Sequence, residues 1–298
     1  MSIRFDGKVA IVTGAGGGLG RAHALGLAAR GARVVVNDLG RSGEPPEGAL
    51  RVVGEIEAAG GCAVADGADV TRLDQVRAMA ARAEVLWGRV DILVNNAGIL
   101  SDKSFAKMDM AEFKRVVDVH LIGSANCTKA VWDGMRERNY GRIVFTSSSS
   151  GLYGNFGQAN YGAAKAALIG LMNVLHLEGE KHDIRVNALA PMALTGMTDG
   201  LFSPAEAALL TPQAVTPAVL FLVGEDAPSR TILGAGAGSF AITRIVESPA
   251  IFLGAAEDTP EAIAARWTEL TRMDGLSALR DAFSQSRKYV TAAQELSR

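Results

Sequence analysis

Short runs of β-branched and other apolar residues recur along the chain, and segments of helix length separate them. The clearest six runs are Val9–Val12, Arg33–Asn37, Cys62–Ala65, Val90–Asn95, Arg142–Thr146 and Ile184–Leu189. Most positions in each run are apolar and do not alternate with polar ones, which is typical of parallel strands covered on both sides. The intervals of roughly 20 to 45 residues are long enough for right-handed crossover helices. The pattern therefore predicts an α/β domain with a doubly wound parallel sheet and helices on both faces.

Two stretches interrupt this pattern, and a third ends it. Glycine, proline and serine gather in residues 39–48, and prolines punctuate residues 191–217, so both stretches are predicted to be irregular insertions. From about Glu257 onward the chain becomes polar with helical spacing, as in TPEAIAARWTELTRM. We therefore expect one domain over residues 1–256 and a small helical extension over residues 257–298 that packs on it.

Composition and charge narrow the functional classes. The 298 residues are 48% hydrophobic and 21% charged, which is enough apolar material for a sizeable core. The 30 basic and 32 acidic side chains leave a formal charge of −2, so nothing marks a nucleic-acid-binding surface. Cys62 and Cys127 cannot form a disulfide framework and suit a reducing compartment. The charge-free interval Ile143–Ala164 is too rich in serine, asparagine and glycine to face lipid. We expect a cytoplasmic protein that binds neither nucleic acid nor membrane.

A glycine-rich turn directly follows the first apolar run. Residues 13–20 read TGAGGGLG, and a helical run, RAHALGLAARG, comes next. Glycines let the backbone turn tightly and approach a diphosphate, while free N–H groups at the start of a helix stabilise the anion. Between a strand and a helix, this spacing indicates dinucleotide binding, with Gly14, Gly18, Leu19 and Gly20 at the cofactor. The alternative is a glycine-rich turn without a ligand.

Acidic residues follow the second and third runs. Asp38 lies about 20 residues beyond the glycines, where a carboxylate can accept hydrogen bonds from the adenosine ribose and repel a 2′-phosphate. It therefore favours NAD over NADP, although Arg41 lies close enough in the chain to offset part of this charge. Asp69 and Val70 are placed to meet the adenine. The alternative for Asp38 is a solvated surface residue, and Asp69 taken by itself would be an ordinary loop acid.

Tyr161 and Lys165 stand four residues apart in NYGAAKAALIGLMNVLHLEG, so both side chains project from one face of a predicted helix. Alone, such a pair is more often two partly exposed helix residues. Here a serine cluster, 147–150, precedes it after one strand, and Asn95–Gly98 ends another. A phenol with a pKa of about 10 is a poor base at neutral pH, but a neighbouring ammonium and a positively charged nicotinamide favour the phenolate. With a serine to orient the substrate oxygen, the set suits hydride transfer at a carbinol carbon.

TGxxxGxG, NNAG and YxxxK occur together in this order and resemble the short-chain dehydrogenase/reductase family over about residues 5–250. The resemblance implies a Rossmann-type fold, an NAD-dependent enzyme that interconverts a secondary alcohol and a ketone, and a homodimer or homotetramer. It implies Tyr161 as catalytic acid/base, Lys165 as its partner on the nicotinamide ribose, and Ser148 as the substrate-orienting serine. Besides the glycine turn, it places these residues along the cofactor: Asn96, Ala97, Gly98, Tyr161, Lys165, Pro191 and Thr195.

Longer stretches, VVVNDLG, NNAGILSDKSF and SSSSGLYGNFGQANYGAAK, are similar to a narrower group within that family. This group is the (3R)-hydroxyacyl-CoA dehydrogenase unit of peroxisomal multifunctional enzyme type 2 and its bacterial relatives. The resemblance implies an acyl-CoA thioester, a 3-hydroxyacyl-CoA, as the small-molecule substrate. A carbonyl reductase, or a dehydrogenase of steroids or other hydroxy compounds, stays open as an alternative. A protein that senses NAD without chemistry also stays open, although such proteins usually lose the Tyr–Lys pair.

Two positions depart from the common family pattern. His120 stands where the family has an asparagine in its fourth helix, and histidine occurs there in the narrower group. A neutral imidazole suits the water-linked proton path attributed to that asparagine, which makes His120 a fourth candidate catalytic residue; the alternative is a satisfied buried histidine. Met192 replaces the glycine that usually follows the proline, which affects the nicotinamide side. No metal site is expected, because three histidines lack ligand spacing with one another or with the cysteines: His23, His176 and His182.

Overall fold

The structure is a computed structural model that describes residues 2–41, 43–194, 203–254 and 259–296. It places all six predicted strands in one eight-stranded sheet of order β3-β2-β1-β4-β5-β6-β7-β8. The strands are β1 (Val9–Val12), β2 (Arg33–Asn37), β3 (Cys62–Asp66), β4 (Ile92–Asn95), β5 (Gly141–Thr146), β6 (Ile184–Met192), β7 (Ile232–Gly236) and β8 (Ser239–Thr243). Every neighbouring pair from β3 to β7 is parallel, so the predicted doubly wound sheet is confirmed.

The hydrophobic pattern did not predict β7 and β8. The segment ILGAG of β7 contains two glycines, which weaken the signal of a strand. Between the two strands, Ala237 and Gly238 have φ values of +50° and +73°. Positive φ at both central residues is the geometry of a two-residue hairpin turn, which adds β8 to the edge of the sheet.

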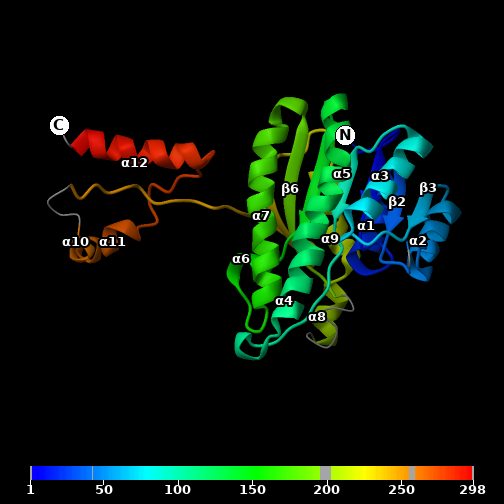
Figure 1. Ribbon diagram of the computed structural model, residues 1–298, viewed down its shortest axis with the longest axis horizontal. Helices are drawn as coiled ribbons and strands as arrows, with labels where there is room; N and C mark the ends of the chain where they lie inside the picture. Colours follow the sequence, from blue (N-terminus) through cyan, green and yellow to red (C-terminus); the bar gives the residue numbers. More distant parts are fainter. Residues whose placement is uncertain (1, 42, 195–202, 255–258, 297–298) are drawn as a thin grey trace. The chain divides into compact units, whose positions relative to one another are not determined.

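Helices cover both faces of the sheet (Figure 1). They are α1 (Gly18–Ala28), α2 (Glu47–Ala58), α3 (Leu73–Trp87), α4 (Met110–Val117), α5 (Gly123–Arg138), α6 (Ser149–Tyr153), α7 (Ala159–Gly179), α8 (Pro204–Leu209) and α9 (Pro212–Leu222). A π-helical turn, η2 (Asp118–Ile122), joins α4 to α5, and short 3-10 turns lie at η1 (Phe105–Lys107) and η3 (Glu180–His182). The helices α1, α2 and α9 pack on one face, and α3, α5 and α7 pack on the other.

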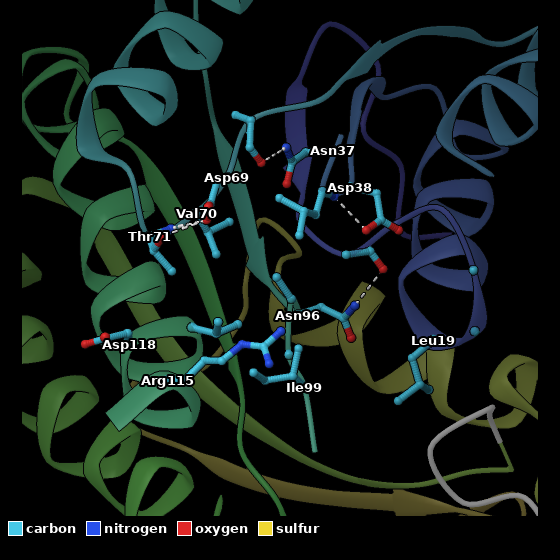
Figure 2. A pocket seen from close by; sticks show the side chains of 18 of the residues that line it. Leu19, Asn37, Asp38, Asp69, Val70, Thr71, Asn96, Ile99, Arg115 and Asp118 are labelled. Carbon is cyan, nitrogen blue, oxygen red and sulfur yellow. Dashed lines mark hydrogen bonds between the residues drawn. The ribbon is translucent and has the colours of Figure 1, made fainter. Parts of the chain in front are cut away.

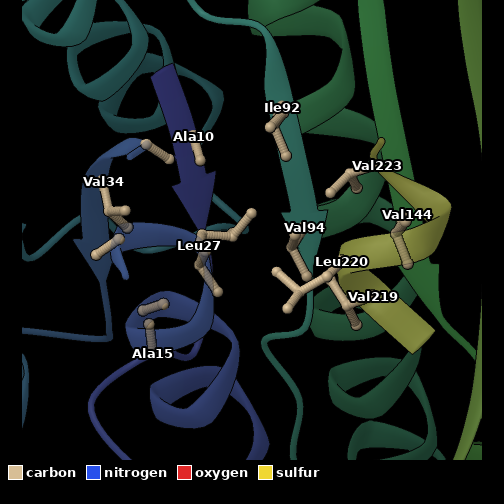
Figure 3. Close-up of a cluster of buried hydrophobic side chains, with 14 of the residues drawn as sticks. Ala10, Ala15, Leu27, Val34, Ile92, Val94, Val144, Val219, Leu220 and Val223 are labelled. Atoms are coloured by element: carbon tan, nitrogen blue, oxygen red, sulfur yellow. The ribbon is translucent and has the colours of Figure 1, made fainter. Parts of the chain in front are cut away.

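Successive residues of a central strand point into two different cores. Ala10 of β1 packs in the core that contains Leu27 of α1 and Val219 of α9 (Figure 3). The next residue, Ile11, belongs to the opposite core with Leu168 of α7. Both faces of the sheet are therefore buried in hydrophobic cores, which explains why the strands are continuous apolar runs in the sequence.

The winding of the sheet reverses between β1 and β4. From β1 the chain builds outward through β2 and β3, then returns to place β4 on the other side of β1. A crevice for ligands forms outside the carboxyl ends of the strands at such a switch point. The glycine turn follows β1 and the Asn95–Gly98 segment follows β4, so the topology brings these two motifs together.

One helical stretch of the described chain, Pro204–Leu222, is long and apolar enough to cross a membrane by length and composition alone. The stretch is not one helix, because α8 ends at Leu209 and Thr211 caps the start of α9 by accepting a hydrogen bond from the Ala214 N–H. The residues of α9 that face the sheet, among them Val219, are fully buried. We therefore interpret the stretch as two elements: α9, a helix of the buried core, and the short helix α8 that precedes it.

The chain divides into two compact units, Met1–Ile242 and Thr243–Arg298. In its described residues, the second unit contains α10 (Pro260–Ala265), α11 (Trp267–Leu270) and α12 (Ala282–Leu296). Within it, Lys288 of α12 pairs with Glu247, with the Nζ and Oε1 atoms 2.7 Å apart. The boundary expected between residues 256 and 257 lies outside the described residues, and the packing of the extension on the sheet domain stays a prediction.

Candidate active site

The glycine turn between β1 and α1 leaves no room for side chains at its two ends. Gly14 has a φ of +63°, a left-handed conformation that favours glycine. A Cβ on Gly20 would lie 2.2 Å from the carbonyl oxygen of Gly14 and 2.7 Å from Nδ2 of Asn96. The helix α1 begins at Gly18 without a side-chain cap, so the N–H groups of its first turn remain available to an anion.

Asn96 ties the end of β4 to this turn. Its Nδ2 donates hydrogen bonds to the carbonyl oxygens of Thr13 and Gly14, at 3.0 and 3.1 Å. In return, the Thr13 hydroxyl accepts hydrogen bonds from the N–H groups of Asn96 and Ala97, at 3.0 and 3.1 Å. The side chain of Asn96 therefore supports the turn, while the segment Asn96–Gly98 forms part of a cavity wall.

That cavity, of about 790 Å³, opens along the carboxyl ends of β1 to β4 (Figure 2). It is lined by nine of the residues predicted to bind the cofactor: Gly14, Gly18, Leu19, Asp38, Asp69, Val70, Asn96, Ala97 and Gly98. Gly20 is buried against the turn and does not line it. Tyr161 also lies outside the lining, but its neighbour His120 contacts Ile99 of the cavity wall.

The Asp38 carboxylate is held at the edge of the glycine turn. Its Oδ2 accepts a hydrogen bond from the Gly16 N–H at 2.8 Å, and its Oδ1 accepts one from the Leu39 N–H at 2.8 Å. Each carboxylate oxygen has a second lone pair, so both can accept a further hydrogen bond from a ligand. Asp69 also lines the cavity, and its Oδ1 accepts hydrogen bonds from the N–H and hydroxyl of Thr71.

Helix α4 and the turn after it supply a cavity wall that was not predicted from the sequence. The residues are Ala111, Lys114, Arg115, Asp118 and Val119. Lys114 pairs with Asp118 at 2.5 Å between Nζ and Oδ2, whereas the guanidinium of Arg115 extends toward Ile99 (Figure 2). The sequence of α4 reads as an ordinary amphipathic surface helix, so it carried no signal of this role.

Ser148, Tyr161 and Lys165 come together where β5 leads into α6 and α7. Ser148 caps α6, and its side chain is hydrogen bonded to the Tyr161 hydroxyl. One turn further along α7, the Nζ of Lys165 lies 5.5 Å from the centre of the Tyr161 ring. The ammonium donates a hydrogen bond to the carbonyl oxygen of Thr146 at 2.5 Å, and Lys165 is buried. The spacing of four residues thus places both side chains on one helix face, as the sequence predicted.

Burial and neighbouring groups of the chain set the ionisation of this cluster in the absence of a cofactor. Burial raises the pKa of Tyr161, a hydrogen bond with Ser148 lowers it, and the negative charge of Asp102 raises it further. Burial also lowers the pKa of Lys165 to about 7. The ammonium was expected to stabilise the phenolate, but it is directed at the Thr146 carbonyl and loses its proton more readily. The chain by itself therefore keeps the phenol protonated at neutral pH.

His120 lies in the π-helical turn η2 and packs edge-on against Tyr161, with the ring centres 5.1 Å apart. Its Nε2 lies 2.8 Å from the Ile99 carbonyl oxygen and 3.1 Å from the Ile99 nitrogen, while its buried Nδ1 has no protein partner. Burial and the nearby charge of Lys165 lower the pKa of His120 to about 3, so the imidazole is neutral at neutral pH. A Cβ on Gly98 would lie 2.3 Å from the ring, which explains the glycine there. A part in a proton path stays a prediction.

The nicotinamide side of the predicted site lies at the end of β6. Pro191 and Met192 are its last two residues, and Met192 is paired with Gly236 of β7. A Cβ on Gly236 would lie 2.7 Å from the Cβ of Met192, so a glycine on the neighbouring strand makes room for the methionine. Thr195 lies outside the described residues. Across the described residues, no three His, Cys, Asp or Glu side chains are grouped so that they could hold a metal ion.

The comparisons with known proteins agree with this geometry. The model of the family described as short chain dehydrogenase matches residues 8–205. The chain is 45% identical over 277 residues to the peroxisomal hydratase-dehydrogenase-epimerase of Saccharomyces cerevisiae, covering 91% of this chain and 31% of the yeast protein. The chain thus spans about a third of that relative's length.

Two solved structures are similar in fold and sequence. Full-length peroxisomal multifunctional enzyme type 2 from Drosophila melanogaster matches with a TM-score of 0.82 and 36% identity, over 98% of this chain and 50% of the fly chain. A 7α-hydroxysteroid dehydrogenase in complex with NADH and 7-oxo glycochenodeoxycholic acid matches with a TM-score of 0.72 and 34% identity. That match covers 79% of this chain and 95% of the steroid enzyme. The resemblance to the multifunctional enzyme group, first read from the motifs, is therefore confirmed.

Proposed function

Because the chain belongs to the short-chain dehydrogenase family, we propose that this oxidoreductase is an NAD-dependent dehydrogenase of 3-hydroxyacyl-CoA thioesters. The observation that carries the proposal is the Ser148–Tyr161–Lys165 cluster, which lies beside a cavity edged by the glycine turn and Asp38. The reaction converts the secondary alcohol at the 3-position into a ketone, and is reversible.

The residues around the cavity fit a nicotinamide dinucleotide. The uncapped start of α1 can bind the diphosphate, and Arg115 adds a cation on the opposite wall. Asp38 has free lone pairs for ribose hydroxyls, whereas a 2′-phosphate would bring further negative charge against it. The NADH complex of the similar 7α-hydroxysteroid dehydrogenase supports a nicotinamide cofactor, and Asp38 supports NAD.

The protein side of the reaction concerns one proton. Oxidation removes a hydride from the carbinol carbon and a proton from its oxygen, and NAD, when bound, would supply the hydride acceptor and a positive charge. Tyr161 as phenolate accepts the proton, while the Ser148 hydroxyl holds the substrate oxygen by a hydrogen bond. Because the chain alone raises the pKa of Tyr161, added positive charge is what makes the phenol a usable base.

The identity of the cofactor can be tested at Asp38. We expect Asp38→Ser to raise the KM for NAD by about tenfold and to lower the KM for NADP, because charge-assisted bonds to the ribose are lost and a repulsive charge is removed. Steady-state kinetics with both cofactors measures the ratio. Asp69→Ser is the matched control, since it removes a carboxylate from the same cavity and should affect both cofactors alike. An unchanged NAD/NADP ratio in Asp38→Ser would show that this carboxylate does not meet the ribose.

The substrate class rests on the relatives and is tested directly. Purified protein is mixed with NAD and either (3R)- or (3S)-3-hydroxyacyl-CoA, and NADH formation is followed by absorbance. We expect turnover of one stereoisomer, since the site fixes the face of the carbinol carbon. The fold match to a 7α-hydroxysteroid dehydrogenase supports a second candidate, a steroid or other hydroxy-compound substrate. Turnover of a hydroxysteroid, with none of either thioester, would replace the first candidate by the second.

A further inference from the structure

A short segment after β4, Ser101–Lys103, is tied to the residues that precede Tyr161 in the chain. The Lys103 N–H donates a hydrogen bond to the Gly157 carbonyl oxygen at 2.9 Å. The Asp102 Oδ2 accepts one from Nε2 of Gln158 at 2.7 Å, and the Ser101 carbonyl oxygen accepts one from Nδ2 of Asn160 at 2.9 Å. Three successive residues of one loop are therefore held against the start of α7.

Gln158 connects this loop to the catalytic serine. Its Oε1 accepts hydrogen bonds from the Ser150 hydroxyl at 2.7 Å and from Nδ2 of Asn155 at 3.1 Å. The Ser150 N–H in turn donates a hydrogen bond to the Ser148 hydroxyl at 3.2 Å. A continuous chain of hydrogen bonds thus runs from the Asp102 carboxylate through Gln158 and Ser150 to Ser148. The proposed proton transfer does not itself use Asp102 or Gln158.

The polar and charged groups around the Tyr161 phenol come from several elements. Lys165 approaches from the next turn of α7, the neutral His120 from η2, and Ser148 from the start of α6. Asp102, from the loop after β4, contributes a negative charge, and this charge raises the pKa of Tyr161. The Asp102 side chain is exposed, but its hydrogen bond to Gln158 holds the carboxylate against the residues that precede α7.

We propose that Asp102 and Gln158 are positioning residues for the Ser148–Tyr161 pair. Gln158 ties the start of α6 to the loop after β4, and through that contact it fixes the position of the Asp102 carboxylate. The fixed negative charge favours the protonated phenol, which is the proton donor for ketone reduction and not the base for alcohol oxidation. This inference rests on the proposed role of Tyr161 as acid/base.

Asp102→Asn tests the charge, because an asparagine oxygen can still accept the hydrogen bond from Gln158. Oxidation requires the phenolate, so its rate rises with pH through the pKa of Tyr161. Removal of the negative charge lowers that pKa, and we expect the rise of kcat/KM to move to lower pH by about half a unit. The shift should shrink at high ionic strength, because Asp102 is exposed. The plateau rate should stay within about twofold of the wild type.

Gln158→Met tests the positioning, because methionine keeps the length of the side chain and removes its hydrogen bonds. We expect kcat to fall by about tenfold with an unchanged Kd for NADH, since Ser148 and the loop after β4 are no longer held in place by Gln158. In the Gln158→Met background, Asp102→Asn should no longer shift the pH profile, because the two residues act as one unit. Asn155→Ala is the control: it removes the other bond to the same Gln158 oxygen and should leave rate and profile unchanged.

A titration without substrate separates this inference from the proposed function. The near-ultraviolet absorbance of phenolate is followed against pH, and the trace of Tyr161→Phe is subtracted to isolate Tyr161 from the other three tyrosines. Asp102→Asn should lower the isolated pKa whatever the substrate of the enzyme is. The inference is overturned if Asp102→Asn leaves the titration of Tyr161 unchanged. It is also overturned if Asp102→Asn shifts the pH profile of kcat/KM equally in the wild type and in Gln158→Met. Either result counts against it even if the dehydrogenase activity is found.

Discussion

Tyr161→Phe is expected to lower kcat by on the order of 10³-fold, the usual contribution of a positioned acid/base group. Phenylalanine keeps the ring that packs edge-on against His120 and removes only the hydroxyl that bonds to Ser148. Because Tyr161 lies outside the lining of the cavity, the Kd for NADH should stay within about twofold of the wild type. Stopped-flow or steady-state turnover, together with a fluorescence titration of NADH, measures both quantities.

Tyr153→Phe is the matched control for that experiment. Tyr153 ends helix α6 and is 73% exposed, and loss of its hydroxyl removes the same chemical group a short distance along the chain. We expect turnover close to that of the wild type. If Tyr161→Phe retained most of its activity, another residue would have to carry the proton, and the cluster of Ser148, Tyr161 and Lys165 would lose its assigned chemistry.

Gly20→Ala is expected to have the largest effect on cofactor binding. Its Cβ would lie 2.2 Å from the carbonyl oxygen of Gly14, and a backbone atom cannot move aside as the end of a side chain can. Overpacking of this kind costs about 1–3 kcal/mol, so the glycine turn must open and the Kd for NADH should rise by about 10- to 100-fold. Asn96 would be displaced with it, because its Nδ2 lies 2.7 Å from the added atom.

Gly54→Ala separates this effect from a general response of helical glycines. Gly54 lies in α2, and an added Cβ there would meet no atom within 4 Å. We expect NADH binding unchanged and stability raised by up to about 1 kcal/mol, since alanine suits a helix better. Thermal unfolding and NADH titration of both variants provide the comparison. Equal NADH affinity in Gly20→Ala and the wild type would mean that the turn does not depend on this close contact.

The strands were predictable because burial of both faces leaves a direct mark on the sequence. Runs such as Val9–Val12 are apolar at every position, since alternate residues enter two different cores. The strand β7 escaped prediction because its glycines and the two-residue turn after it are favourable only once β6 lies beside them. Its place in the sheet follows from a pairing between residues 44 positions apart.

The candidate site was predictable only where its residues are close in the sequence. The glycine turn and the Tyr–Lys spacing follow from local geometry, because a strand, a turn and a helix set the directions of their own side chains. Arg115 gave no such signal, since nothing in α4 shows that one of its faces borders the cavity. The direction of the Lys165 ammonium toward Thr146 was equally hidden, because it depends on how α7 lies against the end of β5.

The sequence by itself predicted a doubly wound sheet, a dinucleotide site at a glycine turn, and a tyrosine and a lysine on one helix face. These features follow from residue type and spacing within one or two elements. Only the tertiary structure decided what sets the ionisation of that tyrosine: its burial, its hydrogen bond with Ser148, and the charge of Asp102, which Gln158 holds from 56 residues away. Burial and distance control the pKa of a group, and neither exists until distant segments have packed together.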